Sequence, residues 1–283
     1  MKNVRSAIES LVICVIGAVI LTISEMGGAL LQKVIPVPDY LSYVVFGFFY
    51  ILFVVILTRL FYNFVLKQSF TFGKSPDSKE AVKWVIVGVI LPLLLNSFII
   101  LSTKGQWMEN HSTSKLLLVS FALFGLAIPA GVCEEIIFRG FMFNFINKTL
   151  GLLWACVIPS LFFAFIHVFN GQLNMTSFLM LMLAGTSVGI MFSMIRVYSG
   201  SIWCSIIVHV LWDLLCFNQQ NTLVSLQNNP VVENSMLSYK INTPSLLITG
   251  GDYGIETSGM GILIYITVAV VIFYRYKKVQ LIK

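Results

Sequence analysis

The fold of this chain is decided by residues 116–146, which read LLLVSFALFGLAIPAGVCEEIIFRGFMFNFI. Two adjacent carboxylates and a guanidinium, from Glu134, Glu135 and Arg139, interrupt a run that is otherwise apolar enough to cross a membrane. An ionised side chain at the centre of a membrane helix costs about 2.5 to 3.5 kcal/mol even on insertion scales. Such a cluster persists when its members are paired or line a wet cavity. We therefore predict an intramembrane polar cavity at this point of the chain.

The composition of the whole chain is that of a membrane protein. Of 283 residues, 58% are hydrophobic and 11% charged, which leaves too few polar side chains to cover a water-soluble globule of this size. Because apolar stretches near the length of a membrane crossing recur, we expect an all-α polytopic membrane protein with about eight transmembrane helices. The predicted spans are 8–31, 41–66, 83–101, 116–133 continuing to 146, 152–170, 177–198, 201–217 and 259–276.

The basic residues gather at alternate ends of these spans. The net charge of +6 could suggest a nucleic-acid binder, but Lys and Arg lie beside apolar spans and are not interleaved with aromatic residues, so we expect membrane lipid and no nucleic acid as a partner. The small size and the lack of a soluble domain favour an integral protein of a bacterial plasma membrane. Cytoplasmic segments are enriched in Lys and Arg, which predicts that both termini are cytoplasmic. The residues assigned to that side are Lys2, Arg5, Arg59, Lys67, Lys74, Lys79, Lys83, Arg139, Lys148, Arg196, Arg275, Lys277, Lys278 and Lys283.

Four segments follow from this pattern. Residues 1–115 hold N-terminal transmembrane helices, and residues 116–217 hold the polar cluster and two further histidines. Residues 218–258 form a polar, Asn-rich extracytoplasmic connector, whose role the sequence does not reveal. Residues 259–283 contain a C-terminal transmembrane helix and a basic tail.

The apolar run at 116–146 is too long for one straight crossing, because about 30 helical residues extend about 45 Å against a hydrocarbon core of about 30 Å. Pro129 and Gly131 predict a break in the helix just before the acidic pair, since proline removes a backbone donor and clashes with the preceding turn. The second half-helix would then begin near Glu134 and Glu135, where the helix dipole favours negative charge.

The spacing of the charged side chains gives the two glutamates different roles. Glu135 precedes Arg139 by four residues, the favourable order for an ion pair on one helix face, so we interpret this pair as structural. Glu134 lies about 100° around the helix from Glu135 and cannot share Arg139 as well. Its carboxylate is therefore free to face the cavity, which makes Glu134 the catalytic candidate.

Two later apolar spans also contain histidines. His167 ends a span that has no other titratable side chain, and His209 lies one helical turn before Asp213. A lone histidine in an apolar helix is more often a packed residue than a functional one, and His209 fixed by Asp213 is an equally ordinary arrangement. The three spans nevertheless all place ionisable groups at membrane depth, and convergence on one cavity explains them together.

Other patterns do not predict chemistry. Residues 185–189, GTSVG, match the G-x-S-x-G nucleophile elbow, but that motif needs a strand-to-helix turn, whereas these residues lie in a Met- and Leu-rich span. Small residues there favour close helix packing. The sequence has no H-E-x-x-H zinc motif. The five cysteines form no C-x-x-C pair and are interpreted as small buried side chains.

The pattern of 134-EExxxR-139, 163-FxxxH-167 and 209-HxxxD-213 resembles the three-motif signature of the CPBP family, the CAAX-protease and bacteriocin-processing (Abi) membrane proteins. The resemblance implies an intramembrane endopeptidase that acts on a membrane-associated peptide or protein tail, in peptide processing or self-immunity. It implies that Glu134 and His167 activate a water and that His209 and Asp213 stabilise the oxyanion or orient its donor. Glu135, Arg139 and Phe163 would support the site.

Three alternatives stay open. The same side chains could bind Zn²⁺ through Glu134, His167 and His209, although we favour a site without a metal or other cofactor because Glu135 is engaged by Arg139, which leaves few carboxylates to neutralise a dication. A non-catalytic immunity or scaffold protein that binds a membrane partner could retain the motifs for folding. A small proton-coupled transporter is disfavoured, because the sequence shows no internal repeat.

Overall fold

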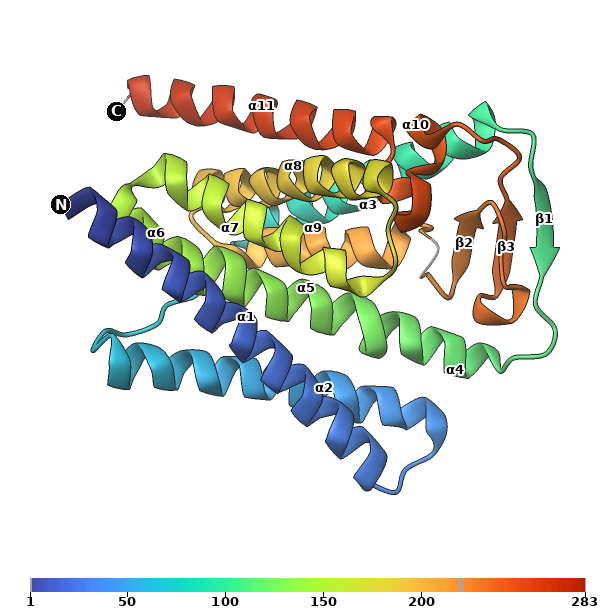
Figure 1. The fold of residues 1–283 in the computed structure, drawn as a ribbon, viewed down its shortest axis with the longest axis horizontal. Helices are drawn as coiled ribbons and strands as arrows, with labels where there is room; N and C mark the ends of the chain where they lie inside the picture. Colours follow the sequence, from blue (N-terminus) through green and yellow to red (C-terminus); the bar gives the residue numbers. More distant parts are fainter. Residues whose placement is uncertain (1, 219–220, 283) are drawn as a thin grey trace.

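The computed structural model describes residues 2–218 and 221–282, and these form a bundle of long helices with a small sheet at one end (Figure 1). Within those residues, seven helical spans are long and apolar enough to cross a membrane, and a shorter apolar helix accompanies them. The prediction of an all-α polytopic membrane protein is confirmed. The helices outside the acidic span are α1 (Lys2–Val34), α2 (Asp39–Leu60), α3 (Ser78–Ser102), α7 (Leu152–His167), α8 (Met175–Ser199), α9 (Ile202–Leu215), α10 (Leu246–Thr249) and α11 (Gly259–Ile282).

The acidic span is one continuous helix, so the predicted break at Pro129 is wrong. Its consecutive parts are α4 (Lys115–Ser120), a π-helical stretch (Phe121–Ala127), α5 (Ile128–Glu134), a second π-helical stretch (Glu135–Met142) and α6 (Phe143–Leu150). Pro129 is near the start of α5, directly after the first π-helical stretch. A change from i→i+5 to i→i+4 bonding already leaves backbone groups unpaired, so a missing N–H there is tolerated. Glu134 and Glu135 consequently lie in mid-helix and have no helix N-terminus beside them.

Helix α9 is shorter than the other spans that contact it. Its 14 residues extend about 21 Å, less than the hydrocarbon thickness of about 30 Å. The side chain of Asn221 donates to the backbone carbonyls of Asp213, Leu214 and Cys216, which satisfies the C-terminal end of the helix. The end of α9 is therefore enclosed by polar groups from the connector, at the place where His209 and Asp213 need a non-lipid environment.

Small residues bring the helices of the site close together. Cβ atoms added at Gly185 and Gly189 would lie 2.8 Å from the Cβ of Ala164 and 2.7 Å from the Cβ of Ser160, so α7 and α8 approach too closely for larger side chains. This geometry supports the interpretation of 185–189 as a packing motif. On α5, a Cβ at Gly131 would meet Val210 of α9 at 2.7 Å, which places the helix of Glu134 directly against the helix of His209.

The connector folds over one end of the bundle. Its strands β2 (Val224–Gln227) and β3 (Leu237–Lys240) join β1 (Gln106–Glu109) in a sheet of order β1-β3-β2, with β1 antiparallel and β2 parallel to β3. Both chain termini lie at the opposite end of the bundle (Figure 1). The connector and the termini are thus separated by the full length of the spans.

This arrangement generates a topology prediction. A fluorescent protein fused after Lys283 should be bright on the cytoplasmic side, and alkaline phosphatase inserted after the exposed Asn229 should be active outside, because the basic residues gather at the end that holds the termini. The measurement is reporter activity in intact cells, with the reporters exchanged between the two positions as the control. Activity of both reporters on the same side would remove at least one span.

Candidate active site

The floor of the site is the ion pair between Glu135 and Arg139, both fully buried. The Nη1 of Arg139 lies 2.9 Å from the Oε1 of Glu135, and its Nη2 donates to the carbonyl oxygen of Gly189 on α8 at 3.0 Å. The guanidinium carbon also lies 5.0 Å from the ring of Phe163 and 5.2 Å from the ring of Phe192. One arginine therefore joins the acidic helix to α7 and α8 through charge, hydrogen bonding and cation–π contact.

The imidazole of His209 is fixed from two sides. Its Nδ1 lies 3.0 Å from Oε1 of Glu135, and an ionised carboxylate only accepts, so Nδ1 carries the proton that is donated. Its ring stacks on Phe192 with centroids 4.5 Å apart. Asp213, expected to orient this ring, instead lies 3.6 Å from Nε2. The carboxylate at hydrogen-bonding distance is Glu135, which thus contacts both Arg139 and His209.

His167 is fixed by its own helix. Its Nδ1 lies 2.7 Å from the carbonyl oxygen of Phe163, which can only accept, so Nδ1 is protonated in this geometry. A neutral ring then presents an unprotonated Nε2 to the cavity. The Phe163 ring packs against the imidazole with centroids 4.5 Å apart.

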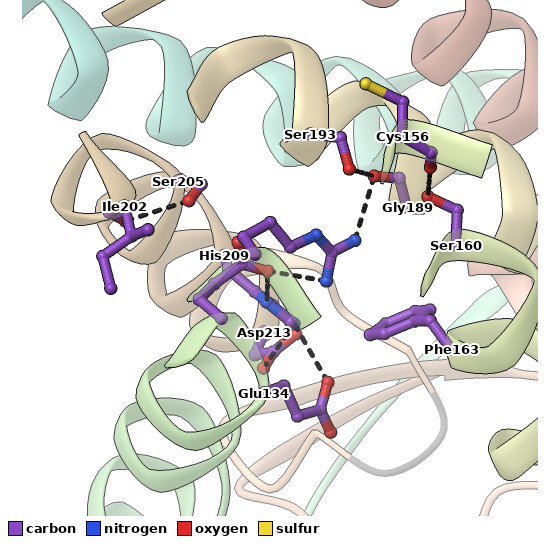
Figure 2. Close-up of polar contacts among 12 residues, drawn as sticks. Glu134, Cys156, Ser160, Phe163, Gly189, Ser193, Ile202, Ser205, His209 and Asp213 are labelled. Atoms are coloured by element: carbon purple, nitrogen blue, oxygen red, sulfur yellow. Dashed lines mark hydrogen bonds and ion pairs between the residues drawn. The ribbon is translucent and has the colours of Figure 1, made fainter. Parts of the chain in front are cut away.

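Glu134 lies between the two imidazoles. Figure 2 shows it beside His209 and Asp213. Its Oε1 is 3.9 Å from Nε2 of His167, and its Oε2 is 3.7 Å from Nε2 of His209. Both distances exceed those of direct hydrogen bonds and are of the kind that a water molecule can bridge. The three spans therefore converge, and Glu134 is the carboxylate that faces both histidines.

These side chains line a cavity of about 150 Å³. The four residues predicted as catalytic, Glu134, His167, His209 and Asp213, all contribute to its wall. The connector contributes further polar residues that sequence reasoning missed: Asn218, Asn221, Tyr253 and Glu256. No local motif marks them, because their placement depends on how the connector folds back over α9. The cavity therefore lies at the connector end of the bundle.

Side chains that could bind a metal do not form a ready cluster in the part of the chain that the structure describes. Within 2–218 and 221–282, no group of three His, Cys, Asp or Glu side chains is arranged to hold a metal ion. The buried Glu135, engaged by both Arg139 and His209, is not free to serve as a ligand. The five cysteines are free thiols in buried positions, which agrees with their interpretation as small packed side chains.

The burial of the Glu135–Arg139 pair predicts that losing Arg139 destabilises the protein far more than losing the arginine of an exposed pair. Arg139→Ala should destabilise the protein by about 3 to 5 kcal/mol, because it leaves a buried carboxylate without its counter-charge. The measurement is folded yield and thermal unfolding of the purified protein. Arg5→Ala is the matched control, since Arg5 and Glu9 form a pair of the same spacing that is exposed to solvent and should contribute little. Wild-type yield and thermal stability in the Arg139 variant would contradict the structural role.

Comparison with known proteins identifies the polar core. Residues 113–215 match the family model described as type II CAAX prenyl endopeptidase Rce1-like. No curated protein matches the chain. The matched segment contains all three motifs, so the resemblance drawn from them is confirmed. Residues 113–215, the part of the chain that holds the polar core, are therefore similar to the CPBP family of CAAX-type intramembrane proteases.

Proposed function

We propose that this protein is an intramembrane endopeptidase in which a water molecule, activated by Glu134 and His167, attacks a peptide carbonyl of a membrane-associated substrate. One observation carries the proposal. The carboxylate of Glu134 lies 3.9 Å from Nε2 of His167 and 3.7 Å from Nε2 of His209, within the cavity that the helices and the connector enclose. This is a place where one small reactant is held between a base and a hydrogen-bond donor.

The base side of the site consists of Glu134 and His167. Because Nδ1 of His167 donates to the Phe163 carbonyl, its Nε2 is available to accept a hydrogen bond from water. The water proton passes to Glu134 as the water oxygen bonds to the carbonyl carbon. The same proton then passes to the leaving nitrogen as the C–N bond breaks, which leaves a carboxylic acid and an amine. General-base assistance of this kind contributes about 10² to 10⁴ in rate.

The electrophilic side consists of His209. With its Nδ1–H donated to Glu135, a protonated ring has one remaining donor, Nε2–H, and that atom faces the cavity. In the absence of substrate this donor is directed at Asp213 and Glu134, which lie 3.6 and 3.7 Å away. The oxyanion that develops in the transition state would accept the hydrogen bond from Nε2–H instead. One such donor is worth on the order of 3 to 4 kcal/mol in the transition state.

Substrate access follows from the position of the cavity. It lies at the connector end, opposite the termini, and the charge pattern assigns that end to the extracytoplasmic side. At about 150 Å³, a volume that accommodates a benzene molecule, it holds a side chain or a bent peptide bond rather than a prenyl chain. These properties favour exported membrane peptides, as in secreted-peptide or bacteriocin processing or immunity, over cytoplasmic prenylated tails.

The proposed chemistry predicts which variants lose activity without losing the fold. Glu134→Gln, His167→Ala and His209→Ala should each reduce cleavage of a membrane peptide by at least about 10². Each variant should still accumulate in the membrane, since none removes the carboxylate that neutralises the buried Arg139. His111→Ala is the control, because His111 is exposed and lies outside the cavity. If Glu134→Gln cleaves as fast as wild type, Glu134 is not the base. If neither protein cleaves the peptide and both keep their function in cells, a non-catalytic immunity or scaffold role replaces the protease.

The proposed site is independent of metal. We expect purified, chelator-washed protein to retain full activity, because Glu134, His167 and Glu135 supply the base and its support without a dication. The check is elemental analysis of the active protein beside its cleavage rate before and after chelation. Stoichiometric zinc whose removal stops cleavage and whose return restores it would make Glu134 a ligand. The general base would then have to be another residue.

A further inference from the structure

The end of the connector forms one wall of the cavity and is held there at several points. The carboxylate of Asp252 accepts hydrogen bonds from the backbone and side chain of Asn174, and the backbone N–H of Asp252 donates to Ser177 at the start of α8. On the other side, the hydroxyl of Tyr265 in α11 donates to the backbone carbonyl of Glu256 at 3.1 Å. Between these anchors, Tyr253 and Glu256 line the cavity.

The backbone of this segment is fixed by its own turn. The hydroxyl of Thr257 donates to the carbonyls of Gly250 and Gly254, at 2.6 and 3.0 Å. Gly254 adopts φ = +101°, and a Cβ there would lie 2.0 Å from Oδ1 of Asn218. The position therefore admits only glycine. As a result, the side chain of Glu256 is presented to the cavity by a fixed turn and not by a loose loop.

The cavity has an excess of hydrogen-bond acceptors. Three carboxylates line it, from Glu134, Asp213 and Glu256, whereas no Lys or Arg among residues 2–218 and 221–282 does. Asn218 is 6% exposed, and its Oδ1 has no hydrogen-bond partner among those residues. Its amide nitrogen faces the carbonyl of Tyr253, at 3.4 Å, so the unpaired atom is the acceptor. The Oδ1 of Asn218 is enclosed and lies against Gly254, so Asn218 braces the turn that carries Glu256.

The remaining walls suit a cation as well. The rings of Trp212, Tyr253 and Tyr265 line the cavity beside Glu256. Trp212 and Tyr265 pack together with centroids 5.1 Å apart. Aromatic faces attract ammonium and guanidinium groups, particularly where water is excluded. Carboxylates and aromatic rings thus converge on one small volume.

We infer that Glu256 is a specificity residue, which binds a Lys or Arg side chain of the peptide substrate close to the scissile bond. That the cation belongs to a substrate rests on the proposed function, but binding of a cation can be tested without cleavage. The carboxylate of Glu256 would form a charge-assisted hydrogen bond to the cation, and the aromatic rings beside it would attract the same group.

The protonation of Glu256 makes this contact sensitive to pH. Burial raises the pKa of the Glu256 carboxyl to about 7, with His209 lowering it and Glu134 raising it further. The other titratable groups in the cavity wall are His167, Asp213, Cys216, Tyr253 and Tyr265. A bound cation favours the ionised carboxylate, and protonation of the carboxyl opposes binding. Cation affinity should therefore be greatest above pH 7 and fall as the pH drops through 7.

The first experiment measures binding of benzamidine, an aromatic amidinium of suitable size, to the full-length Glu134→Gln protein in detergent micelles. Benzamide is the neutral control of the same shape. We expect benzamidine to bind roughly tenfold more tightly than benzamide at pH 8. Glu256→Gln in the same background should abolish this difference, and Glu233→Gln, which changes an exposed carboxyl of the same connector, should keep it.

Equal affinities for benzamidine and benzamide in the protein with Glu256 intact would overturn the inference, whether or not the protein is a protease. So would an undiminished preference in Glu256→Gln. Glu256→Asp keeps the charge on a shorter side chain and should retain part of the preference. If Glu256→Gln lowers the yield of folded protein, two measurements still decide the outcome. These are the affinities of Glu256→Asp and the comparison of benzamidine with benzamide on the protein in which Glu256 is unchanged.

The second experiment reads specificity in the cleavage reaction itself. Wild-type protein in liposomes is given a mixture of peptides with an apolar anchor, and the cleaved bonds are identified by mass spectrometry. Lys or Arg should be enriched at one position beside the cleaved bond. Glu256→Gln should raise KM for those peptides about tenfold with little change for neutral peptides, and Glu256→Lys should shift the enrichment to acidic residues. Cleavage without basic enrichment overturns the specificity role but leaves the proposed protease intact.

Discussion

The buried ion pair of Glu135 and Arg139 is the interaction on which the rest of the structure depends. Two charges without solvent exposure are stable only when each is compensated, and here the two compensate each other and are supported by groups from three further helices. Arg139 reaches Gly189 on α8 and the ring of Phe163 on α7, while Glu135 reaches His209 on α9. Loss of either charge would leave the other buried without its counter-charge, at the point where these helices meet. Glu135 therefore supports the fold, and the adjacent Glu134 is left for the chemistry.

A second constraint is the distance between helices. The imidazoles of His167 and His209 belong to different helices, and both lie within 4 Å of one carboxylate only because the helices approach closely. Gly131, Gly185 and Gly189 permit that approach. In lipid there is little hydrophobic drive for helices to associate, so close packing through small residues supplies the contact. The polar cavity therefore depends on glycines that take no part in the reaction.

Much of this architecture could be predicted from sequence, and the failures have physical reasons. Apolar length and charge spacing are local properties, so the spans and the Glu135–Arg139 pair were predictable. The effect of Pro129 on the helix was not predictable, because it depends on the hydrogen-bond pattern of the preceding turn, which is π-helical. The contact between Glu135 and His209 joins residues 74 positions apart, and the place of Glu256 depends on a connector without a pattern. Contacts between residues that are far apart in the chain produce no periodic pattern in the sequence, so they could not be predicted from it.

The two glutamates differ because they point in different directions, although they are neighbours in sequence. The α-helix that carries Glu134 changes to a π-helical stretch at Glu135. A π-turn uses one residue more than an α-turn and so alters which face the following side chains occupy. Glu135 and Arg139 are four residues apart and pair in the packed interior. Glu134, one residue earlier, lies on the face that meets His167 and His209. The offset of one residue along the helix therefore places the reactive carboxylate towards the histidines and its neighbour's carboxylate towards the arginine.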